Sequence, residues 1–541
     1  MAEGKKLYFA EWRVATPAFN SYEDIQYGQG ELGTDFTDNC DGRWGLTLGP
    51  LINVVTCSTY DTGGITPTNA LGAADSGTMN ATVFLYVARG RGIAKITAST
   101  LALADPSVII DLTEAASGPP VYSRSANGTQ MISFPMDNTA YHNITTVANA
   151  GSADTASANN EGTICRILGF GGSKNQVGFY GGFGRSGAAG TAMNTIRENI
   201  LSGVVTMDAS AWSTVATVTD SLSPTSWAMD DDFWLPGTDR GPLFVEARFT
   251  EFRPLIGSIS QNAANRVIQI DWYGMNVLIC NATGTRYSTS LSGESVGPGL
   301  FPRNSSPVQG RCTGAAGLER WLIWNEYNVI TGETYVLAAR PRQSGDGHNQ
   351  PLSFYTLATL TNTESRFCKD IGTLGGATSP RVLMGHDTAA APGNVAWCKY
   401  GRVARWYDDT AYDFAASGTW YGTKLLRQPH WKKRIKYIEI DGLSDMTSTE
   451  TITLQIDMVN PDTGVTSTQT CGAAISKNGT TRIWAKEGDP WLSVSFRPRL
   501  VFARGGTTTT SPKVAPEGIL RIAYELEELA IDGRLPNEAP P

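Results

Sequence analysis

The sequence predicts an all-β protein in which a β-propeller-like repeat of short antiparallel sheets precedes a C-terminal β-sandwich-like domain. Three observations support this: short apolar runs recur in hairpin-like pairs, glycine-containing turns join them, and helical periodicity is almost absent. An isolated hairpin is marginally stable in water, so recurring hairpins must belong to larger sheets. Repeated small sheets are typical of propellers, and a pair of stacked β-sandwiches is the alternative.

The clearest hairpin lies near the N-terminal end of the repeat. The apolar run Val83–Ala88 meets the turn Arg89–Gly92, and the chain returns as Ile93–Ile96. We interpret the turn as structural rather than as a phosphate-binding loop, with Arg89 and Arg91 solvated or paired at an interface. Similar pairs of runs recur within residues 163–183, 266–291, 319–342 and 381–409.

The strands become longer and more regular beyond residue 428. Pro461–Gly464, with the sequence PDTG, predicts a hairpin turn. Near the C-terminus, Leu520, Ile522, Tyr524 and Leu526 alternate with polar residues and Ala523, which predicts a strand with one buried face. The best helix candidate is Asn194–Gly203. The predicted parts are an N-terminal extended segment (1–44), a propeller-like domain (45–427), a C-terminal β domain (428–531) and a tail (532–541).

Composition and charge argue against a dedicated nucleic-acid-binding protein. The formal net charge is −8, and charged residues make up 17% of the chain, against about 25% in typical soluble proteins. Such a binder normally shows a basic stripe. The nearest basic cluster is Lys432, Lys433, Arg434 and Lys436, which we interpret as the solvated start of a strand. Sequence-specific nucleic-acid binding is therefore not expected.

The sequence also bears on where the protein is made. The N-terminus lacks the uninterrupted apolar stretch of a signal peptide. No run reaches the roughly 18 apolar residues that a membrane span needs. The eight cysteines are scattered without a CxxC pair, so we predict reduced thiols within or beside strands. These observations predict synthesis in a cytoplasm and no membrane span.

One acidic run is a candidate binding or cation loop. Asp230, Asp231 and Asp232 stand beside Trp234. Acidic loops on one rim of a propeller can bind calcium or flank a glycosidic bond. However, consecutive aspartates need not converge on a point, and a solvated turn is the main interpretation.

Other motifs give no support for catalysis. Gly182–Gly187 matches GxGxxG by letter, but a dinucleotide site also needs a preceding strand, a helix that opens at the third glycine and a later acidic residue. The surroundings are glycine-rich and β-like, so we predict a flexible loop instead. The four histidines match no zinc spacing. No GxSxG, HExxH or GxxxxGK[ST] motif occurs. We therefore predict no catalytic residue, no metal ligand and no cofactor, and expect that the protein is not an enzyme.

The chain nevertheless resembles a known class of proteins. The repeat-like LYVARGRGIAKI, the blade-like VLMGHDTAAAPGNVAWCKYGRVARWYDD and the closing SPKVAPEGILRIAYELEEL resemble, in style over most of the chain, tail-associated propeller proteins of tailed bacteriophages. No diagnostic motif carries the resemblance, so no family residue is transferred. The resemblance implies an oligomeric structural protein of the virion tail, of the nozzle, tail-tube or tail-tip type. Its expected partners are other tail proteins and further copies of itself, with host contact or DNA passage as associated roles.

Two other functions remain open at this point. A propeller-type glycoside hydrolase would need carboxylates that converge at the propeller axis, some of them from Asp230–Asp232. A glycan-binding adhesin would need an exposed aromatic groove around residues such as Trp234 or Trp420. The resemblance favours the structural role over both.

Overall fold

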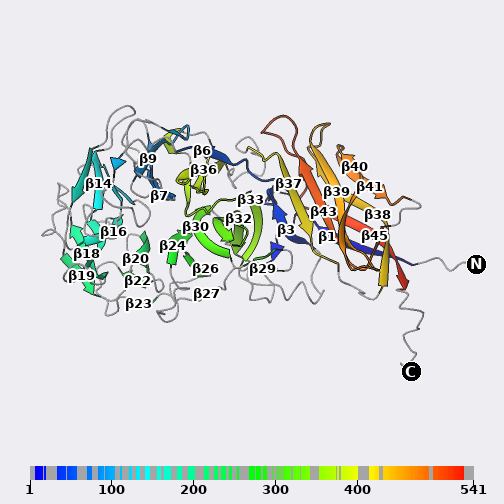
Figure 1. The fold of residues 1–541 in the computed structure, drawn as a ribbon, viewed down its shortest axis with the longest axis horizontal. Helices are drawn as coiled ribbons and strands as arrows, with labels where there is room; N and C mark the ends of the chain where they lie inside the picture. Colours follow the sequence, from blue (N-terminus) through cyan, green and yellow to red (C-terminus); the bar gives the residue numbers. More distant parts are fainter. Residues whose placement is uncertain are drawn as a thin grey trace, which may run out of the picture. The chain divides into compact units, whose positions relative to one another are not determined.

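The computed structural model divides into two compact units (Figure 1). The first comprises residues 1–51, 352–358 and 412–541, and the second comprises residues 52–351 and 359–411. The structure describes residues 6–15, 18–19, 33–43, 45–57, 70–75, 83–89, 92–103, 330–341, 352–372, 374–376, 379–399, 413–425, 431–486 and 491–528, together with the strands named below between residues 104 and 328. No helix in these described ranges is long and apolar enough to cross a membrane.

The first unit contains two antiparallel sheets. The β1 sheet runs in the order β1-β45-β38-β41, and β42 and β44 also pair with β38. Its strands are β1 (Leu7–Arg13), β38 (Trp431–Ser444), β41 (Gly479–Trp484), β42 (Trp491–Ser493), β44 (Lys513–Val514) and β45 (Ile519–Glu528).

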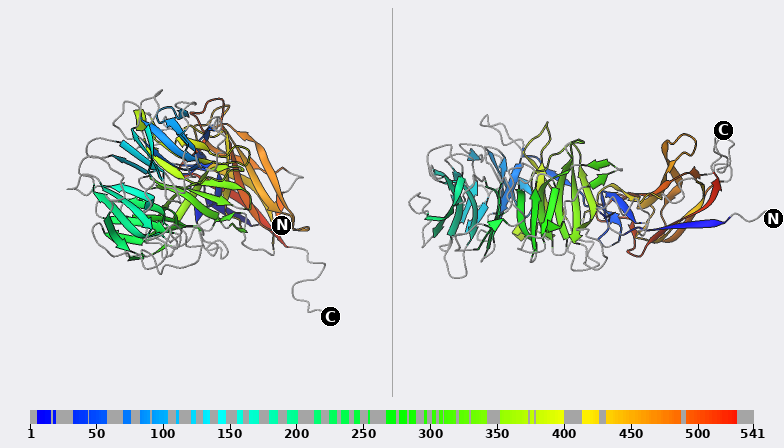
Figure 2. Two further views of the ribbon diagram at one scale, coloured as in Figure 1. Left: turned by 60° about the vertical axis from the view of Figure 1, so that its left-hand side comes forward. Right: turned by 90° about the horizontal axis from the view of Figure 1, so that it is seen from below.

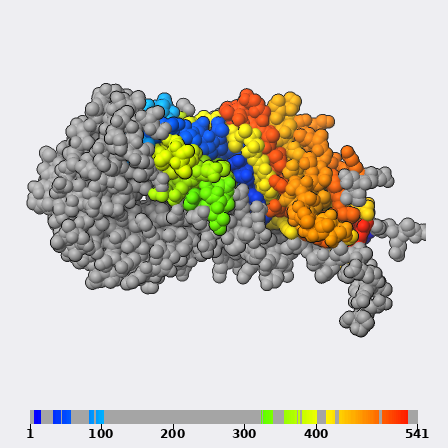
Figure 3. Space-filling model, viewed as in Figure 1, coloured from blue at the N-terminus to red at the C-terminus, as the bar shows by residue number. Residues whose placement is uncertain are grey.

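The second sheet, the β3 sheet, runs in the order β3-β37-β43-β39-β40. Its strands are β3 (Thr34–Asp38), β37 (Ser417–Gly422), β39 (Thr451–Val459), β40 (Thr466–Ile475) and β43 (Phe496–Ala503). Two short strands accompany it, β4 (Cys40–Asp41) and β5 (Thr47–Leu48), whereas β2 (Ala18–Phe19) pairs with residues 353–354 of another strand. Figure 3 shows the described residues of this unit in colour.

Side chains from both sheets meet in one hydrophobic core. Alternate residues of β43 and β45 point inward, among them Leu500, Phe502 and Ile522, and Trp12 of β1 joins them. This alternation is what a strand buried on one face requires. The predicted β-sandwich is therefore confirmed. The predicted PDTG turn also joins β39 to β40, with Gly464 in the left-handed region at φ +69°.

The N-terminal residues belong to this sandwich, which differs from the extended segment predicted for 1–44. β1 pairs with β45 from Leu7↔Glu525 to Arg13↔Ile519. In Figure 2 the blue N-terminal strand runs beside the red C-terminal strand. β3 pairs likewise with β37. Local sequence could not show this, because each strand's partner lies hundreds of residues away.

In the second unit, the described strands form seven sheets of three or more strands that follow one another along the chain, and one two-stranded hairpin. The first three contain β7 (Ala70–Asp75), β8 (Phe84–Arg89), β9 (Gly92–Thr97), β10 (Ala102–Leu103) and β11 (Ile110–Asp111); β12 (Val121–Arg124), β13 (Gln130–Phe134), β14 (Tyr141–Thr146) and β15 (Thr155–Asn159); and β16 (Ile164–Gly171), β17 (Phe179–Arg185), β18 (Met193–Ile200) and β19 (Ser213–Thr217).

The next two sheets contain β20 (Pro224–Met229), β21 (Phe233–Thr238), β22 (Leu243–Glu246) and β23 (Arg253–Pro254); and β24 (Val267–Tyr273), β25 (Asn276–Asn281), β26 (Gly284–Ser288) and β27 (Ser295–Val296). The last two contain β30 (Gly310–Leu318), β31 (Trp321–Asn328) and β32 (Glu333–Pro341); and β34 (Cys368–Gly372), β35 (Arg381–His386), β36 (Asn394–Lys399) and β6 (Asn53–Val55). Other elements are the hairpin β28 (Phe301–Arg303) and β29 (Ser306–Val308), the strand β33 (Leu352–Leu360) and the 3₁₀ turn η4 (Leu374–Gly376).

These sheets form a closed, propeller-like ring. The first strand of each sheet contacts the first strand of the next, in the order β7, β12, β16, β20, β24, β30 and β34, and β34 contacts β7 again. The last sheet is completed by β6, which comes from the N-terminal side and pairs with β36. Closure of this kind leaves few free strand edges. The propeller-like fold is confirmed. The sheets described above also give the number of blades, which the sequence alone did not predict.

Two local predictions meet different outcomes. The hairpin around Arg89–Gly92 is β8 and β9, paired from Phe84↔Thr97 to Arg89↔Gly92. Every residue of β8 is buried, including Arg89, so the prediction that Arg89 is solvated is wrong. Arg91 lies outside the described residues. The predicted helix over Asn194–Gly203 is wrong: Met193–Ile200 form β18, which pairs with β17 and β19. The helix-compatible composition of this segment is outweighed by hydrogen bonding to the strands on either side of it.

Candidate functional site

Asp230, Asp231 and Asp232 lie outside the described residues. Trp234 lies in β21, paired in register with Met229 and Val245, and its side chain is likewise not described. Among the residues whose side chains are described, no group of three or more histidines, cysteines or acids could hold a metal ion. Gly182–Arg185 of the GxGxxG match lie in strand β17, so the flexible loop predicted there is wrong for these four residues.

The described cysteines are buried and form no disulfide bond within the described part of the chain: Cys40, Cys57, Cys368, Cys398 and Cys471. Burial raises the pKa of Cys57 to about 11 and that of Cys471 to about 12. A thiolate is the reactive form of cysteine, so raised pKa values disfavour nucleophilic chemistry at these positions. Their role is packing.

The basic run after residue 430 is an ion-paired strand. Lys432 meets Asp462 at 3.0 Å. Arg434 meets Glu527 at 2.6 Å, and Lys436 meets Glu525 at 3.0 Å. The last two pairs link β38 to β45. These cations therefore stabilise the sheet through carboxylate partners, which supports interpreting them as part of a strand.

Lys433 differs from its neighbours because it is fully buried. Its ammonium donates hydrogen bonds to the carbonyl oxygens of Val494 and Trp431. Burial lowers its pKa from 10.5 to about 8. The charged form is therefore penalised in the folded state, and this penalty disappears as the pH rises from about 8 to 10.5.

We accordingly predict a pH-dependent stability difference between the wild type and Lys433→Met. Between pH 8 and 10.5, the free energy of unfolding of the wild type should rise relative to the variant by about 1.4 kcal/mol per pH unit. Urea unfolding at several pH values measures this difference. The cysteines with raised pKa values are present in both proteins, so their titration contributes equally and does not affect the difference in stability. A difference that stays constant with pH would contradict the prediction.

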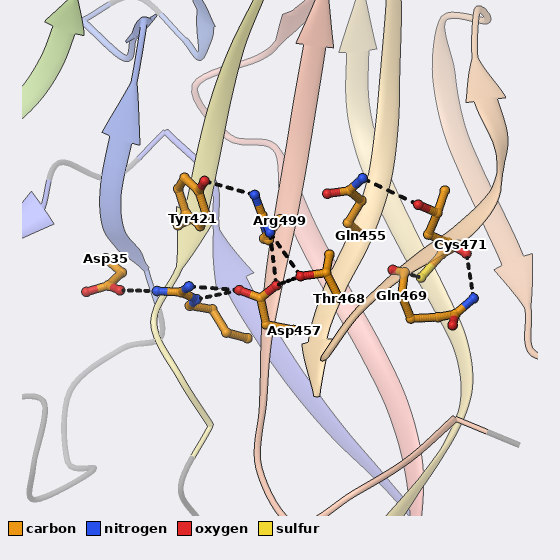
Figure 4. Close-up of polar contacts among 10 residues, drawn as sticks. Asp35, Tyr421, Gln455, Asp457, Thr468, Gln469, Cys471 and Arg499 are labelled. Carbon is orange, nitrogen blue, oxygen red and sulfur yellow. Dashed lines mark hydrogen bonds and ion pairs between the residues drawn. The ribbon is translucent and has the colours of Figure 1, made fainter. Parts of the chain in front are cut away.

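A charge cluster lies on the side of the β3 sheet that faces away from the core (Figure 4). Asp457 of β39 accepts hydrogen bonds from Arg497 at 2.8 Å and Arg499 at 3.1 Å, and from the Thr468 hydroxyl at 2.7 Å. Arg497 also pairs with Asp35 of β3 at 3.1 Å. Two carboxylates and two guanidinium groups thus balance one another across three strands.

Aromatic rings complete this cluster. Phe36 and Tyr421 stack with their centroids 4.0 Å apart. Arg497 and Arg499 lie over the Tyr421 ring, at 4.9 and 4.6 Å from its centroid. Arg499 also donates a hydrogen bond to the Tyr421 hydroxyl at 2.9 Å. Since the arginines already have carboxylate and ring partners, the arrangement suits a rigid surface rather than a vacant anion site.

The two carboxylates respond to this environment in opposite directions. Burial raises the pKa of Asp35, although the charge and hydrogen bond of Arg497 oppose the effect. Burial also acts to raise the pKa of Asp457, but hydrogen bonds from Thr468 and the arginines, with the Arg497 charge, outweigh it. The pKa of Asp457 is therefore lower than 3.8 in the folded state, and its ionised form stabilises the fold.

We predict that Asp457→Asn lowers the free energy of unfolding by about 2 kcal/mol at pH 7. The effect is smaller than for a fully buried pair because Arg497 and Arg499 are 19% and 21% exposed. As the pH falls below 3.8, the wild type loses this contribution and the two proteins should converge. Urea unfolding at pH 7 and in acid tests this. Equal stabilities at pH 7 would contradict it.

A row of alternating charges crosses the outer face of the β1 sheet. In register from β1 to β41, it consists of Glu11, Arg521, Glu439 and Arg482. Arg521 meets Glu11 at 2.6 Å and Glu439 at 3.1 Å. Arg482 in turn pairs with Glu439. We call these four residues the charge row. It has an acid at the β1 edge and a base at the β41 edge.

A second row, the apolar row, lies beside it on the same face. It consists of Phe9, Ala523, Tyr437 and Trp484. Tyr437 and Ala523 are buried in the middle, whereas Phe9 is 51% exposed and Trp484 is 61% exposed. The rings of Tyr437 and Trp484 lie 4.8 Å apart, and Arg482 covers Tyr437 at 4.5 Å. Large exposed apolar side chains of this kind are typical of contact surfaces.

The two outer strands of this sheet are open at their edges. β1 pairs only with β45, and β41 only with β38, among the described strands. This surface is not visible in the sequence, because Phe9 and Trp484 enter the same sheet only through long-range strand pairing. The sequence did single out Trp420 for an exposed groove, and this is wrong. Trp420 is fully buried, and its indole N–H donates to the Thr34 hydroxyl at 2.8 Å.

No protein-family model and no curated protein matches the chain. Among solved structures, the chain is similar to one from a humanized mutant of the Chaetomium thermophilum Polycomb Repressive Complex 2 bound to the inhibitor GSK126, with 9% identity, TM-score 0.39, and 66% of this chain and 98% of that chain covered. BBS1N in complex with ARL6DN shares 11% sequence identity with the chain at a TM-score of 0.38, and the match covers 66% of this chain and 98% of that chain. The AfRom2 CNH domain shares 10% sequence identity with the chain at a TM-score of 0.37, and the match covers 65% of this chain and 98% of that chain.

Proposed function

We propose that the chain is an oligomeric structural component of the tail of a tailed bacteriophage, in which the sandwich unit makes contacts between copies. The observation that carries the oligomeric role is the outer face of the β1 sheet. There, Phe9 and Trp484 are exposed at two open strand edges, next to a row of charges. The assignment to a phage tail comes from the resemblance of the sequence and stays a proposal.

Edge protection supports this division of roles between the units. The second unit closes its ring by pairing β6 with β36, which leaves few free edges there. Among the described strands of the first unit, β1 and β41 each pair on one side only. An open edge strand is a template for another chain, so an assembling protein would be expected to use this unit for contacts. A location in the virion, partnership with other tail proteins, and host contact or DNA passage would follow from the same proposal.

Negative-stain electron microscopy of the purified full chain at increasing concentration tests the proposal. We expect rings or stacked tubes of several copies, with the mass confirmed by light scattering. Single particles at every concentration, combined with turnover of a polysaccharide that Asp231→Ala abolishes, would instead establish the glycoside hydrolase alternative. Single particles that bind a glycan without cleaving it would establish the adhesin.

A further inference from the structure

We infer that the β1 sheet continues from one copy of the chain into the next, with β1 of one copy adding to β41 of its neighbour. This inference rests on the proposed oligomeric function and names the surface that would perform it. The occupant of the open β41 edge is therefore a second copy of this chain. Three features of the β1 sheet support it: strand direction, the end charges of the charge row and the end groups of the apolar row.

Strand direction permits the addition. Each neighbouring pair in the order β1-β45-β38-β41 is antiparallel. β1 and β41 therefore run in opposite directions. A second copy that is rotated about an assembly axis without being turned over would place its β1 antiparallel to β41. Such a head-to-tail contact uses two different edges and can repeat, as a closed ring requires.

The charge row is complementary to itself across this contact. It begins with Glu11 at the β1 edge, which is 48% exposed, and ends with Arg482 at the β41 edge, which is 44% exposed. When β1 of a second copy is placed beside β41, its Glu11 falls next to Arg482. The alternation of acid and base then continues from copy to copy without two like charges meeting. Opposite charges at neighbouring cross-strand positions favour this register.

The apolar row agrees with the same register. Phe9 is two residues from Glu11 on β1, and Trp484 is two residues from Arg482 on β41. Because the strands are antiparallel, aligning Glu11 with Arg482 also aligns Phe9 with Trp484. The two most exposed side chains of the row would then cover each other. Aromatic pairs at facing positions are among the stabilising cross-strand contacts. One register thus satisfies both rows.

Single substitutions at either edge should weaken self-association. We expect Phe9→Lys and Trp484→Lys each to raise the dissociation constant about tenfold or more, since truncating a central aromatic anchor commonly has this effect. Val465→Lys is the matched control, because Val465 is 63% exposed in the same unit but lies in the β39–β40 turn. The control should assemble like the wild type, and circular dichroism checks that all variants fold.

Complementation then tests the head-to-tail geometry. Phe9→Asp and Trp484→Lys should each assemble poorly alone. In an equal mixture, Asp at position 9 would meet Lys at position 484, and the two unchanged edges would meet each other. The mixture should therefore recover assemblies larger than dimers in light scattering. Recovery of dimers alone would overturn the inference, because it indicates a two-fold contact between sheet faces.

The remaining outcomes separate this inference from the proposed function. If the wild type assembles and neither edge variant weakens assembly, sheet extension is excluded while the oligomeric function stands. If the wild type is monomeric at every concentration, both are excluded.

Discussion

Replacing Trp12 with alanine is expected to lower the free energy of unfolding of the sandwich unit by about 4 kcal/mol. The Trp12 side chain is fully buried, and its ring lies 6.0 Å from that of Phe496. Its indole N–H donates a hydrogen bond to the carbonyl oxygen of Thr423 at 2.9 Å. Alanine would leave a large cavity and an unpaired carbonyl group. It would also remove the main inward anchor of β1.

Hydrogen exchange of the β45 amides measures this effect, because β45 is the strand with which β1 pairs. A loss of about 4 kcal/mol corresponds to roughly a thousandfold faster exchange through opening of the unit. Val465→Ala is the matched control, since Val465 is 63% exposed in the same unit and lies in the β39–β40 turn, outside the β1 sheet. We expect the control to change exchange by less than about tenfold. Comparable effects of the two substitutions would show that β1 is not anchored through the core.

The parts of the fold that sequence predicted correctly are those fixed by neighbouring residues. The hairpin around Arg89–Gly92 is enclosed within 14 residues of chain and appears as β8 and β9. The Pro461–Gly464 turn needs only its own glycine at positive φ. The alternation from Leu520 to Leu526 follows from burial of one face of β45. Each of these signals is local.

The parts that sequence missed depend on partners that lie far away. The segment predicted to be extended contributes β1 and β3 to the two sandwich sheets, because β45 and β37 supply their hydrogen-bond partners. Residues 194–200 form a strand because β17 and β19 flank them. The apolar row was invisible for the same reason: residues 9 and 484 share a face only after β45 and β38 have paired between them.

Arg89→Met is expected to destabilise the closing sheet of the propeller-like ring by about 3 kcal/mol. Arg89 is 3% exposed and donates a hydrogen bond to the carbonyl oxygen of Cys57 at 2.6 Å. The amide of Cys57 donates to the Asn394 side chain at 2.9 Å. Both contacts fix the chain just after β6, where Val55 pairs with Val395 of β36. Methionine keeps most of the side-chain volume but leaves the buried Cys57 carbonyl without this donor.

The destabilisation caused by Arg89→Met should be confined to the second unit, and hydrogen exchange of individual strands can show whether it is. Amides of β6 and β36 should exchange about a hundredfold faster in Arg89→Met, because a loss of about 3 kcal/mol makes local opening of the ring more frequent. Amides of β43 in the sandwich should be unchanged. Arg366→Met is the matched control, since Arg366 is 40% exposed in the same unit and pairs with Glu364 at 3.3 Å. If both variants exchange like the wild type at β6, the strand is held by its backbone pairing to β36 and not by the Arg89 contact.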